Sequence, residues 1–316
     1  MNIGILESEE FSEAAIKSLL QIGKVSFYNK KLSLTSFLKD ISILFVRLKY
    51  NINKDFLDYS AKLRFICSPT TGLNHIDLKE IERRNIKLIS LKGSYRFLSN
   101  IRATPEHTFG LVLSLIRNYK SAFLNVENRG WDRDRYKGTE LFKNKIGIIG
   151  FGRVGKLLAK FFKIFGAIVY FYDIREIKTK YGAIFVESLP ELINNSNIVI
   201  LSASYSDSYR NFFNKNLIDL LKDKYFINTS RGELIEEKYL ISKIEKNYFK
   251  GIALDVIANE QGKNNLEKLV SLTNDRNFIL TPHIAGLTYE SLNKAEEFIA
   301  YKLLKQINLA GDEIDS

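Results

Sequence analysis

The stretch 145-KIGIIGFGRVG-155 decides the fold of this chain. Its apolar run 146-IGII-149 predicts a buried strand, and 150-GFGRVG-155 matches the pattern G-x-G-x-x-G. A helix-like segment, 154-VGKLLAKFFKIF-165, follows at once. A strand, a glycine-rich turn and a helix in this order predict the phosphate-binding turn of a dinucleotide-binding α/β domain.

The glycines and the start of the helix have distinct expected roles. Gly150 permits the tight turn, Gly152 lets the backbone approach a pyrophosphate, and Gly155 allows close helix packing. The pyrophosphate is expected on the amides at the N-terminus of the helix, which makes Arg153 and Val154 candidate cofactor-binding residues.

A second strand-like run, 168-IVYFY-172, ends in Asp173, at roughly the 20-residue spacing expected after the glycines. The Asp173 carboxylate would accept hydrogen bonds from the adenosine ribose. Its charge would repel a 2′-phosphate, so the sequence predicts NAD rather than NADP as the cofactor. Arg175 is the neighbouring residue that could accommodate such a phosphate.

Short apolar runs elsewhere in the chain predict further strands, at residues 2–7, 41–46, 63–68, 86–90, 198–202, 225–229, 251–256 and 278–281. Most of these runs do not alternate between apolar and polar residues, and helix-like segments lie between them. This pattern is typical of parallel sheets that are covered by helices on both faces. We therefore predict an α/β fold with doubly wound parallel sheets. The length of 316 residues is enough for two domains.

The overall composition limits the class of protein. The chain is 45% hydrophobic and 26% charged, which is ordinary for a globular protein with a core. Its formal net charge of +11 comes from lysines scattered along polar helix faces, without a dense basic block. We therefore expect no nucleic-acid partner, although such a charge could attract small anionic substrates.

The cysteine content and the N-terminus indicate the cellular context. The single cysteine, Cys67, excludes an internal disulfide and a cysteine-based metal cluster, which fits a reducing cytoplasm. The first residues, MNIGILESEE, are acidic where a signal peptide would be basic, and no window approaches the ~18 apolar residues of a membrane span. We expect a cytoplasmic protein with no metal site and no membrane partner.

The chain has three histidines, and His283 is the strongest candidate for chemistry. It follows a proline and precedes small residues, and such a stiff turn suits an imidazole that is presented to a substrate. His107 lies in the first turn of a helix predicted over residues 104–118, with Thr104 as the N-cap, and is expected on the polar surface or in local packing. His75 is expected to be structural.

Three further stretches carry a family resemblance: 228-NTSRGELIEE-237, 251-GIALDVIANE-260 and 281-TPHIAG-286. Together with the glycine turn, they resemble the D-isomer-specific 2-hydroxyacid dehydrogenases, and among these the short phosphoglycerate-dehydrogenase-like members without a regulatory domain. The resemblance covers nearly the whole chain. It implies an NAD-dependent oxidoreductase that transfers a hydride to or from C2 of a D-2-hydroxy acid or its 2-keto acid.

The resemblance also implies two Rossmann- or flavodoxin-like domains, with the NAD domain inserted into the substrate domain. Residues 1–102 and 290–316 would form the substrate-binding domain, and residues 103–289 the NAD-binding domain. A homodimer, formed through the region that follows the central helix, is a further implication.

Matching motifs imply roles for five residues. Arg231 matches the substrate-binding arginine, Glu260 the acidic partner and His283 the acid/base. Thr229 and Asp255 fall on cofactor-binding positions, with Asp255 at the nicotinamide carboxamide.

These residue types suit the implied reaction. Hydride transfer at C2 requires a proton to move on the C2 oxygen, and an imidazole gives and takes protons near neutrality. A neighbouring carboxylate fixes the tautomer and stabilises the imidazolium, while an arginine offers a planar fork of donors to the substrate carboxylate. One departure concerns Gln261, which replaces the proline that usually follows the acidic partner in the family.

The loop 69-PTTGLNHID-77 resembles the family's substrate-carboxylate loop. The backbone amides of Thr71, Gly72 and Leu73 are its candidate ligand atoms. Thr70 departs from the usual glycine–x–glycine pattern and adds bulk.

Arg47 and Arg96 are candidates for binding a second anionic group of the substrate, such as a phosphate. Arg47 follows the predicted strand 41–46, and ligands of parallel α/β units gather at the carboxyl ends of strands. The stretch 92-KGSYRFLSNIRATPEHT-108 is most similar to phosphoglycerate-dehydrogenase-type members, so 3-phosphoglycerate is one candidate substrate. An NAD-responsive, corepressor-like binding protein of the same fold is the alternative function.

Overall fold

The computed structural model describes residues 1–29, 31–175, 177, 181–274 and 276–312. The chain divides into two compact units, Met1–Ile101 with Thr288–Ser316, and Arg102–Leu287. These limits lie within two residues of the domain boundaries expected from the sequence. Among the described residues, no helix is long and apolar enough to cross a membrane.

The first unit contains a five-stranded parallel sheet in the order β2-β1-β3-β4-β5. Its strands are β1 (Asn2–Ile5), β2 (Lys24–Phe27), β3 (Ile43–Phe45), β4 (Phe65–Ser68) and β5 (Lys87–Ser90). Its helices are α1 (Glu13–Leu19), α2 (Leu34–Leu38), α3 (Lys54–Asp58), α4 (Leu78–Arg83), α5 (Tyr95–Leu98) and α13 (Tyr289–Asp312). This strand order is the flavodoxin-like doubly wound order.

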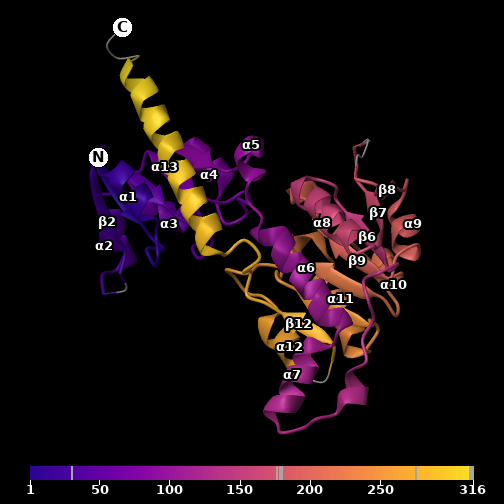
Figure 1. The fold of residues 1–316 in the computed structure, drawn as a ribbon. Helices are drawn as coiled ribbons and strands as arrows, with labels where there is room; N and C mark the ends of the chain where they lie inside the picture. Colours follow the sequence, from indigo (N-terminus) through magenta and orange to yellow (C-terminus); the bar gives the residue numbers. More distant parts are fainter. Residues whose placement is uncertain (30, 176, 178–180, 275, 313–316) are drawn as a thin grey trace. The chain divides into compact units, whose positions relative to one another are not determined.

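The two faces of this sheet are covered by different helices. Ile43 and Phe45 point into a cluster with residues of α1, α5 and α13, whereas Leu44 points into a cluster with residues of α2, α3 and α4. Successive side chains of a strand therefore both meet apolar partners, which explains the near-continuous apolar runs. The helix α13 returns from the far end of the sequence and packs against α1 (Figure 1).

The second unit contains a seven-stranded parallel sheet in the order β12-β11-β10-β9-β6-β7-β8. Its strands are β6 (Lys145–Ile149), β7 (Ile168–Tyr172), β8 (Ile184–Phe185), β9 (Ile198–Leu201), β10 (Tyr225–Asn228), β11 (Gly251–Leu254) and β12 (Phe278–Leu280). Its α-helices are α6 (Ala103–Ile116), α7 (Tyr119–Glu127), α8 (Arg153–Ile164), α9 (Leu189–Asn194), α10 (Lys215–Asp219), α11 (Glu237–Glu245) and α12 (Leu266–Ser271), and its 3-10 helices are η1 (Arg133–Tyr136), η2 (Asp207–Tyr209) and η3 (Gly232–Leu234).

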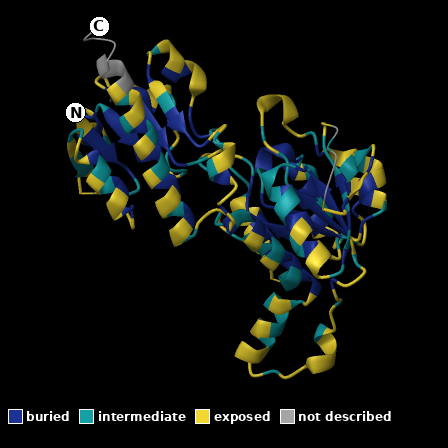
Figure 2. Ribbon diagram, turned by 45° about the horizontal axis from the view of Figure 1, so that its top comes forward, coloured by how far each residue is buried: buried dark blue, intermediate teal, exposed yellow. Residues whose placement is uncertain are grey.

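This second sheet has the Rossmann arrangement, because the strand order reverses on either side of β6. The helices α6 and α8 cover one face and α9 to α12 the other. Figure 2 shows the result in both units: the sheets are buried, and the helices are exposed on their outer sides. The predicted α/β fold class with two doubly wound parallel sheets is confirmed.

Two details of the predicted elements are wrong. The strands β2 and β8 were not predicted, because each lies at a sheet edge, is short and contains no fully buried residue. Thr104 is not the N-cap, since α6 begins at Ala103 after Arg102, and the Thr104 carbonyl accepts a 2.7 Å bond from Thr108 Oγ1. Pro105 is tolerated because the first amides of a helix have no partner within it.

Candidate active site

Predicted site residues follow five strands of the second unit. Gly150 follows β6, Asp173 follows β7, and Arg231 lies shortly after β10. Asp255 follows β11, and His283 lies shortly after β12. All of these strands are parallel, so their carboxyl ends share one edge of the sheet, where ligands of doubly wound folds bind.

The glycine turn after β6 has little room for side chains. Gly150 has a φ of +91°, and an added Cβ would lie 2.7 Å from Cα of Ala203. A Cβ on Gly155 would lie 2.3 Å from the carbonyl oxygen of Gly150. The turn is therefore restricted to glycine by conformation at Gly150 and by close packing of α8 at Gly155.

The N-terminus of α8 fits a pyrophosphate. Gly152 is its N-cap, no side chain caps the helix, and an added Cβ on Gly152 would meet nothing within 4 Å. The backbone here faces open space, and Arg153 and Val154 supply the first helical amides. These amides and the helix dipole favour an anion at this position.

The carboxylate of Asp173 connects the end of β7 to the glycine turn. Its Oδ2 accepts a 2.8 Å bond from the amide of Phe151, and its Oδ1 accepts bonds from the amide and Nε of Arg175 at 3.0 and 3.1 Å. Burial raises the pKa of Asp173, but these bonds outweigh it, so the pKa lies below its usual value. Asp173 is therefore ionised, and Arg175 is paired with it.

The loop after β10 presents Arg231. Asn228 organises this loop, since its Nδ2 donates to the Arg231 carbonyl at 3.0 Å and its Oδ1 accepts from the Ser230 amide at 3.0 Å. Thr229 is buried, with its hydroxyl 2.7 Å from that of Thr108 on α6.

Burial lowers the pKa of Arg231, and the negative charges of Glu260, Glu233 and Asp255 oppose the shift. The guanidinium therefore lies in an acidic surrounding that keeps it charged, as an arginine that binds a carboxylate must be.

The fully buried carboxylate of Asp255 fixes the turn that carries His283. Its Oδ1 accepts from the Thr281 hydroxyl at 2.6 Å and from the Ile284 amide at 2.9 Å, and its Oδ2 accepts from the Ala285 amide at 2.9 Å. The His283 amide also donates to the Asp255 carbonyl at 2.8 Å. Four bonds thus join the end of β11 to this turn.

Burial raises the pKa of Asp255, but hydrogen bonds from His107, Thr281 and the turn amides outweigh it, so the pKa lies below its usual value. Asp255 is expected to be ionised at neutral pH. Both oxygens of Asp255 accept hydrogen bonds from the turn that carries His283. These bonds give Asp255 a structural role in that turn, besides the cofactor-binding role implied by the family resemblance.

His283 and Glu260 meet in this unit. His283 Nδ1 lies 2.6 Å from Glu260 Oε2, and the two side chains are 20% and 23% exposed. Because Nδ1 is engaged, Nε2 is the nitrogen that remains for a substrate. The pair has the arrangement of an acid/base imidazole with an orienting carboxylate.

His107 was expected on the polar surface or in local packing, and it is partly exposed on α6. However, its Nε2 lies 3.4 Å from both Asp255 Oδ1 and Thr281 Oγ1. No sequence pattern indicated this proximity, because α6 and the loop after β11 are far apart along the chain. Only the packing of α6 against β10 and β11 brings His107 to the site.

The remaining predicted residues lie in the first unit. Arg47 Nε donates to Glu296 Oε1 at 2.9 Å, and the Arg47 amide donates to Glu7 Oε2 at 2.9 Å. The Glu296 side chain is fully buried, and its other oxygen accepts from the Ser12 amide at 2.7 Å. These contacts favour a structural role for Arg47, which holds α13 to the end of β3. Arg96 is exposed on α5.

The 69–77 loop follows β4 at the carboxyl edge of its sheet. The Thr70 hydroxyl donates to the Gly72 carbonyl at 2.9 Å and lies 2.8 Å from the Ser68 hydroxyl. The side chain that departs from the family pattern therefore bonds its own loop. Thr71 is exposed, and Gly72 and Leu73 are partly exposed, so the proposed amides lie near the surface.

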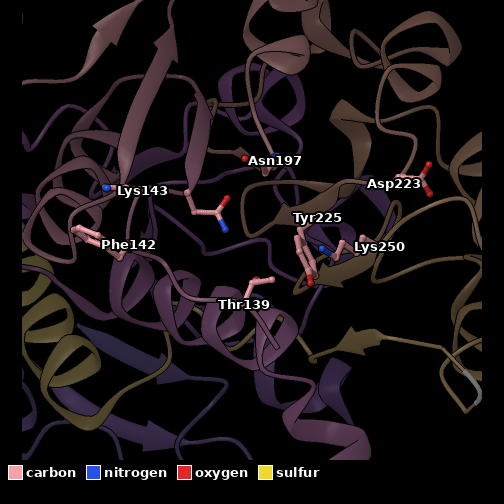
Figure 3. Close-up of a pocket in the computed structure, with 8 residues that line it drawn as sticks. Thr139, Phe142, Lys143, Asn197, Asp223, Tyr225 and Lys250 are labelled. Atoms are coloured by element: carbon pink, nitrogen blue, oxygen red, sulfur yellow. The ribbon is translucent and has the colours of Figure 1, made fainter. Parts of the chain in front are cut away.

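A cavity of about 340 Å³ lies at the opposite edge of the second sheet (Figure 3). It is lined by Thr139, Phe142, Lys143, Asn144, Asn197, Asp223, Tyr225 and Lys250. These residues lie at or before the first residues of β6, β9, β10 and β11. The cavity is thus separated by the length of the strands from the residues described above, and it has no part in their chemistry.

Comparisons with known proteins cover nearly the whole chain. Residues 109–285 match the family model described as D-isomer specific 2-hydroxyacid dehydrogenase, NAD binding domain. The chain is 29% identical over 309 residues to D-3-phosphoglycerate dehydrogenase of Methanocaldococcus jannaschii, covering 96% of this chain and 57% of that protein. It is 30% identical over 324 residues to D-3-phosphoglycerate dehydrogenase 2 of Saccharomyces cerevisiae, covering 98% of this chain and 67% of that protein. The chain therefore spans little more than half the length of the first relative.

A solved structure shows the same fold. The crystal structure of D-lactate dehydrogenase from Aquifex aeolicus, complexed with NAD and lactic acid, matches with a TM-score of 0.84 at 24% identity. The match covers 99% of this chain and 98% of that chain.

Proposed function

Because the chain belongs to the D-isomer-specific 2-hydroxyacid dehydrogenase family, we propose that it transfers a hydride between NAD(H) and C2 of a D-2-hydroxy acid or its 2-keto acid. Residues 109–285 are the family's NAD-binding domain, and the glycine turn fits the cofactor. The observation that carries the proposal is the 2.6 Å contact between His283 Nδ1 and Glu260 Oε2, with the partly buried guanidinium of Arg231 close enough to be stabilised by the charge of Glu260.

In the proposed reaction, His283, Glu260 and Arg231 have different roles. Bound NAD(H) would supply or accept the hydride. Nε2 of His283 gives a proton to the C2 oxygen during reduction and takes it back during oxidation. Glu260, at Nδ1, fixes the tautomer and stabilises the imidazolium, and Arg231 binds the substrate carboxylate.

The test is a panel of 2-keto acids with NADH, scored by loss of NADH. Turnover of any member above that of the His283→Ala variant supports a dehydrogenase. A corepressor-like binding protein would instead show NADH binding without turnover and would retain a protein partner in a pull-down. Absence of turnover with the whole panel, at NADH concentrations that saturate the protein, would contradict the proposal.

For the substrate itself, we propose an acid with a second anionic group, such as 3-phosphoglycerate or its keto acid. Both relatives reported above are named as D-3-phosphoglycerate dehydrogenases, whereas the solved structure is a complex with NAD and lactic acid. Arg96 is exposed on α5 and forms no ion pair with a described residue, so its guanidinium is accessible to a phosphate. The first unit would then be the substrate-binding domain and the second the NAD-binding domain.

Arg96→Ala should raise KM for a phosphorylated 2-keto acid about tenfold to hundredfold, because this fold-change corresponds to the free energy of one charged hydrogen bond. KM for the unphosphorylated analogue should not change. Lys92→Ala, a nearby exposed cation, is the matched control. Equal effects of Arg96→Ala on both substrates would favour a small unphosphorylated acid.

We also propose a homodimer formed through α7 and the segment that follows it. No residue of α7 is buried, and Phe123, Leu124 and Val126 are 61%, 42% and 54% exposed. Trp131 is 84% exposed. An apolar surface of this kind is expected to be covered in solution. Sedimentation of Phe123→Asp should show a monomer where the parent protein shows a dimer, and a parent monomer would contradict the proposal.

A further inference from the structure

Two buried carboxylates, Glu233 and Glu237, have no role in the proposed proton transfer. They are 7% and 8% exposed, on η3 and at the start of α11. A buried carboxylate is costly unless its oxygens accept hydrogen bonds, so the partners of these two groups indicate what they do.

Hydrogen bonds join both carboxylates to one loop, residues 258–265, which carries Glu260. Oε1 of Glu237 accepts from the Ala258 amide at 2.7 Å, and its Oε2 accepts from Asn265 Nδ2 at 2.6 Å. Oε1 of Glu233 accepts from the Asn259 amide at 3.1 Å. The two residues directly before Glu260 are thus bonded to these carboxylates, and one of the carboxylates also bonds the far end of the loop.

The backbone at the first residue of η3 also lies directly against the first residues of the loop. A Cβ on Gly232 would lie 2.0 Å from the carbonyl carbon of Ile257 and 2.2 Å from the amide nitrogen of Ala258. Side chains larger than hydrogen are excluded between the two backbones. Glu233, the next residue, is therefore held at short range from the Asn259 amide.

Within the loop, side-chain amides complete the structure. Asn259 has a φ of 57°, and its Nδ2 donates to the Lys263 carbonyl at 2.8 Å. Asn264 Nδ2 donates to the Glu260 carbonyl at 3.2 Å. Glu260 thus lies in a loop that is bonded at its entrance, across its middle and at its exit, with Gln261 in place of a stiffening proline.

We infer that Glu233 and Glu237 are positioning residues, which hold the 258–265 loop so that the Glu260 carboxylate meets Nδ1 of His283. This inference rests on the proposed function. No hydrogen bond of either carboxylate described above reaches His283, so both act on the His283–Glu260 pair through the loop, while the charge of Glu233 also acts on Arg231. The 2.6 Å contact between Glu260 and His283 tolerates little displacement, and a misplacement of about 1 Å at a reacting group can cost on the order of 10²-fold in rate.

The first test is kinetic. Glu237→Ala removes both acceptors and should lower kcat by about 10-fold to 100-fold, with KM for NADH nearly unchanged. Glu237→Gln keeps an acceptor for the Ala258 amide and should restore most of kcat. Glu236→Gln is the matched control, because Glu236 lies one residue away and accepts from the Lys215 amide at 3.1 Å rather than from the loop. It should change kcat by no more than about twofold.

A double-mutant cycle separates positioning from general stability. If Glu237 acts through Glu260, then Glu237→Ala should cost much less in a Glu260→Gln background than in the parent protein. If the fold-decrease in kcat of the double variant equals the product of the two single-variant decreases, the inference is overturned.

A ring-nitrogen NMR measurement is independent of turnover. The chain has only three histidines, so ¹⁵N-histidine labelling gives few ring signals, and those of His283 are identified by their loss in His283→Ala. Glu237→Ala should shift the His283 ring signals towards those of Glu260→Gln, whereas Glu236→Gln should leave them at parent values. Unchanged His283 signals in Glu237→Ala would overturn the inference even if no 2-keto acid is turned over. A missing turnover with the expected shift would contradict only the proposed function.

Discussion

His283 Nδ1 lies 2.6 Å from Glu260 Oε2, and the His283 backbone adopts a left-handed φ of 55°. A residue other than glycine in this region costs roughly 1–3 kcal/mol and persists only where its surroundings enforce it. The surroundings here are Asp255 and Glu260, which bond the turn and the ring respectively. The strained conformation therefore coincides with the residue that the proposed chemistry needs most.

His283→Ala should nearly abolish turnover while NADH binding survives. General acid–base catalysis is typically worth ~10²–10⁴-fold, and His283 is the proposed proton donor and acceptor. Steady-state kinetics and NADH fluorescence titration measure the two effects separately. A variant with parental kcat would remove His283 from the mechanism.

Asp255→Asn should lose turnover because the His283 turn loosens. The amide group keeps one oxygen acceptor. Either the Ala285 amide therefore loses its acceptor, or the Ile284 amide and the Thr281 hydroxyl lose theirs. Leaving buried amides without partners costs about 1–3 kcal/mol, which should appear as a lower urea midpoint at pH 7.

The effect of Asp255 on stability should also depend on pH. Its folded pKa lies below the unfolded value, so its stabilisation is present above ~3.9 and is lost as the pH falls through the folded pKa. The difference in urea midpoint between parent and Asp255→Asn should shrink between pH 6 and pH 3. A constant difference over this range would show that ionisation of Asp255 contributes nothing.

Asp173 should set the preference for NAD. Asp173→Ser removes the charge that repels a 2′-phosphate and releases Arg175 from its 3.1 Å bond, so the ratio of kcat/KM for NADH over NADPH should fall. Asp173→Ser combined with Arg175→Ala is the control, because it lacks the released cation. A parent protein that already prefers NADPH would contradict this role.

Arg47→Ala should destabilise the first unit rather than discriminate between substrates. Without Arg47, the fully buried Glu296 carboxylate loses its ion pair and keeps the bond from the Ser12 amide. Breaking a buried ion pair costs roughly 3–5 kcal/mol. Urea unfolding measures the loss. The double variant Arg47→Met with Glu296→Gln should recover part of it, because no buried charge is then left alone. Equal stability of Arg47→Ala and parent would instead favour the predicted role in substrate binding.

The sequence by itself determined the fold class and the order of the site motifs. Continuous apolar runs predict strands that are buried on both faces, and glycine at positions 150 and 155 is required because a Cβ would collide with backbone. These signals are local, so they can be read from neighbouring residues. Short edge strands such as β8 carry no such signal, since one side of an edge strand meets solvent.

Tertiary structure alone decided which polar residues meet. The bonds of Glu237 to Ala258 and of Arg47 to Glu296 join residues that are 21 and 249 positions apart. Such pairs depend on the register of parallel strands and on the path of loops between them, which residue type and spacing do not encode. For this reason the sequence indicated the acid/base residue and its carboxylate, but not the two buried glutamates that we propose to hold that carboxylate in place.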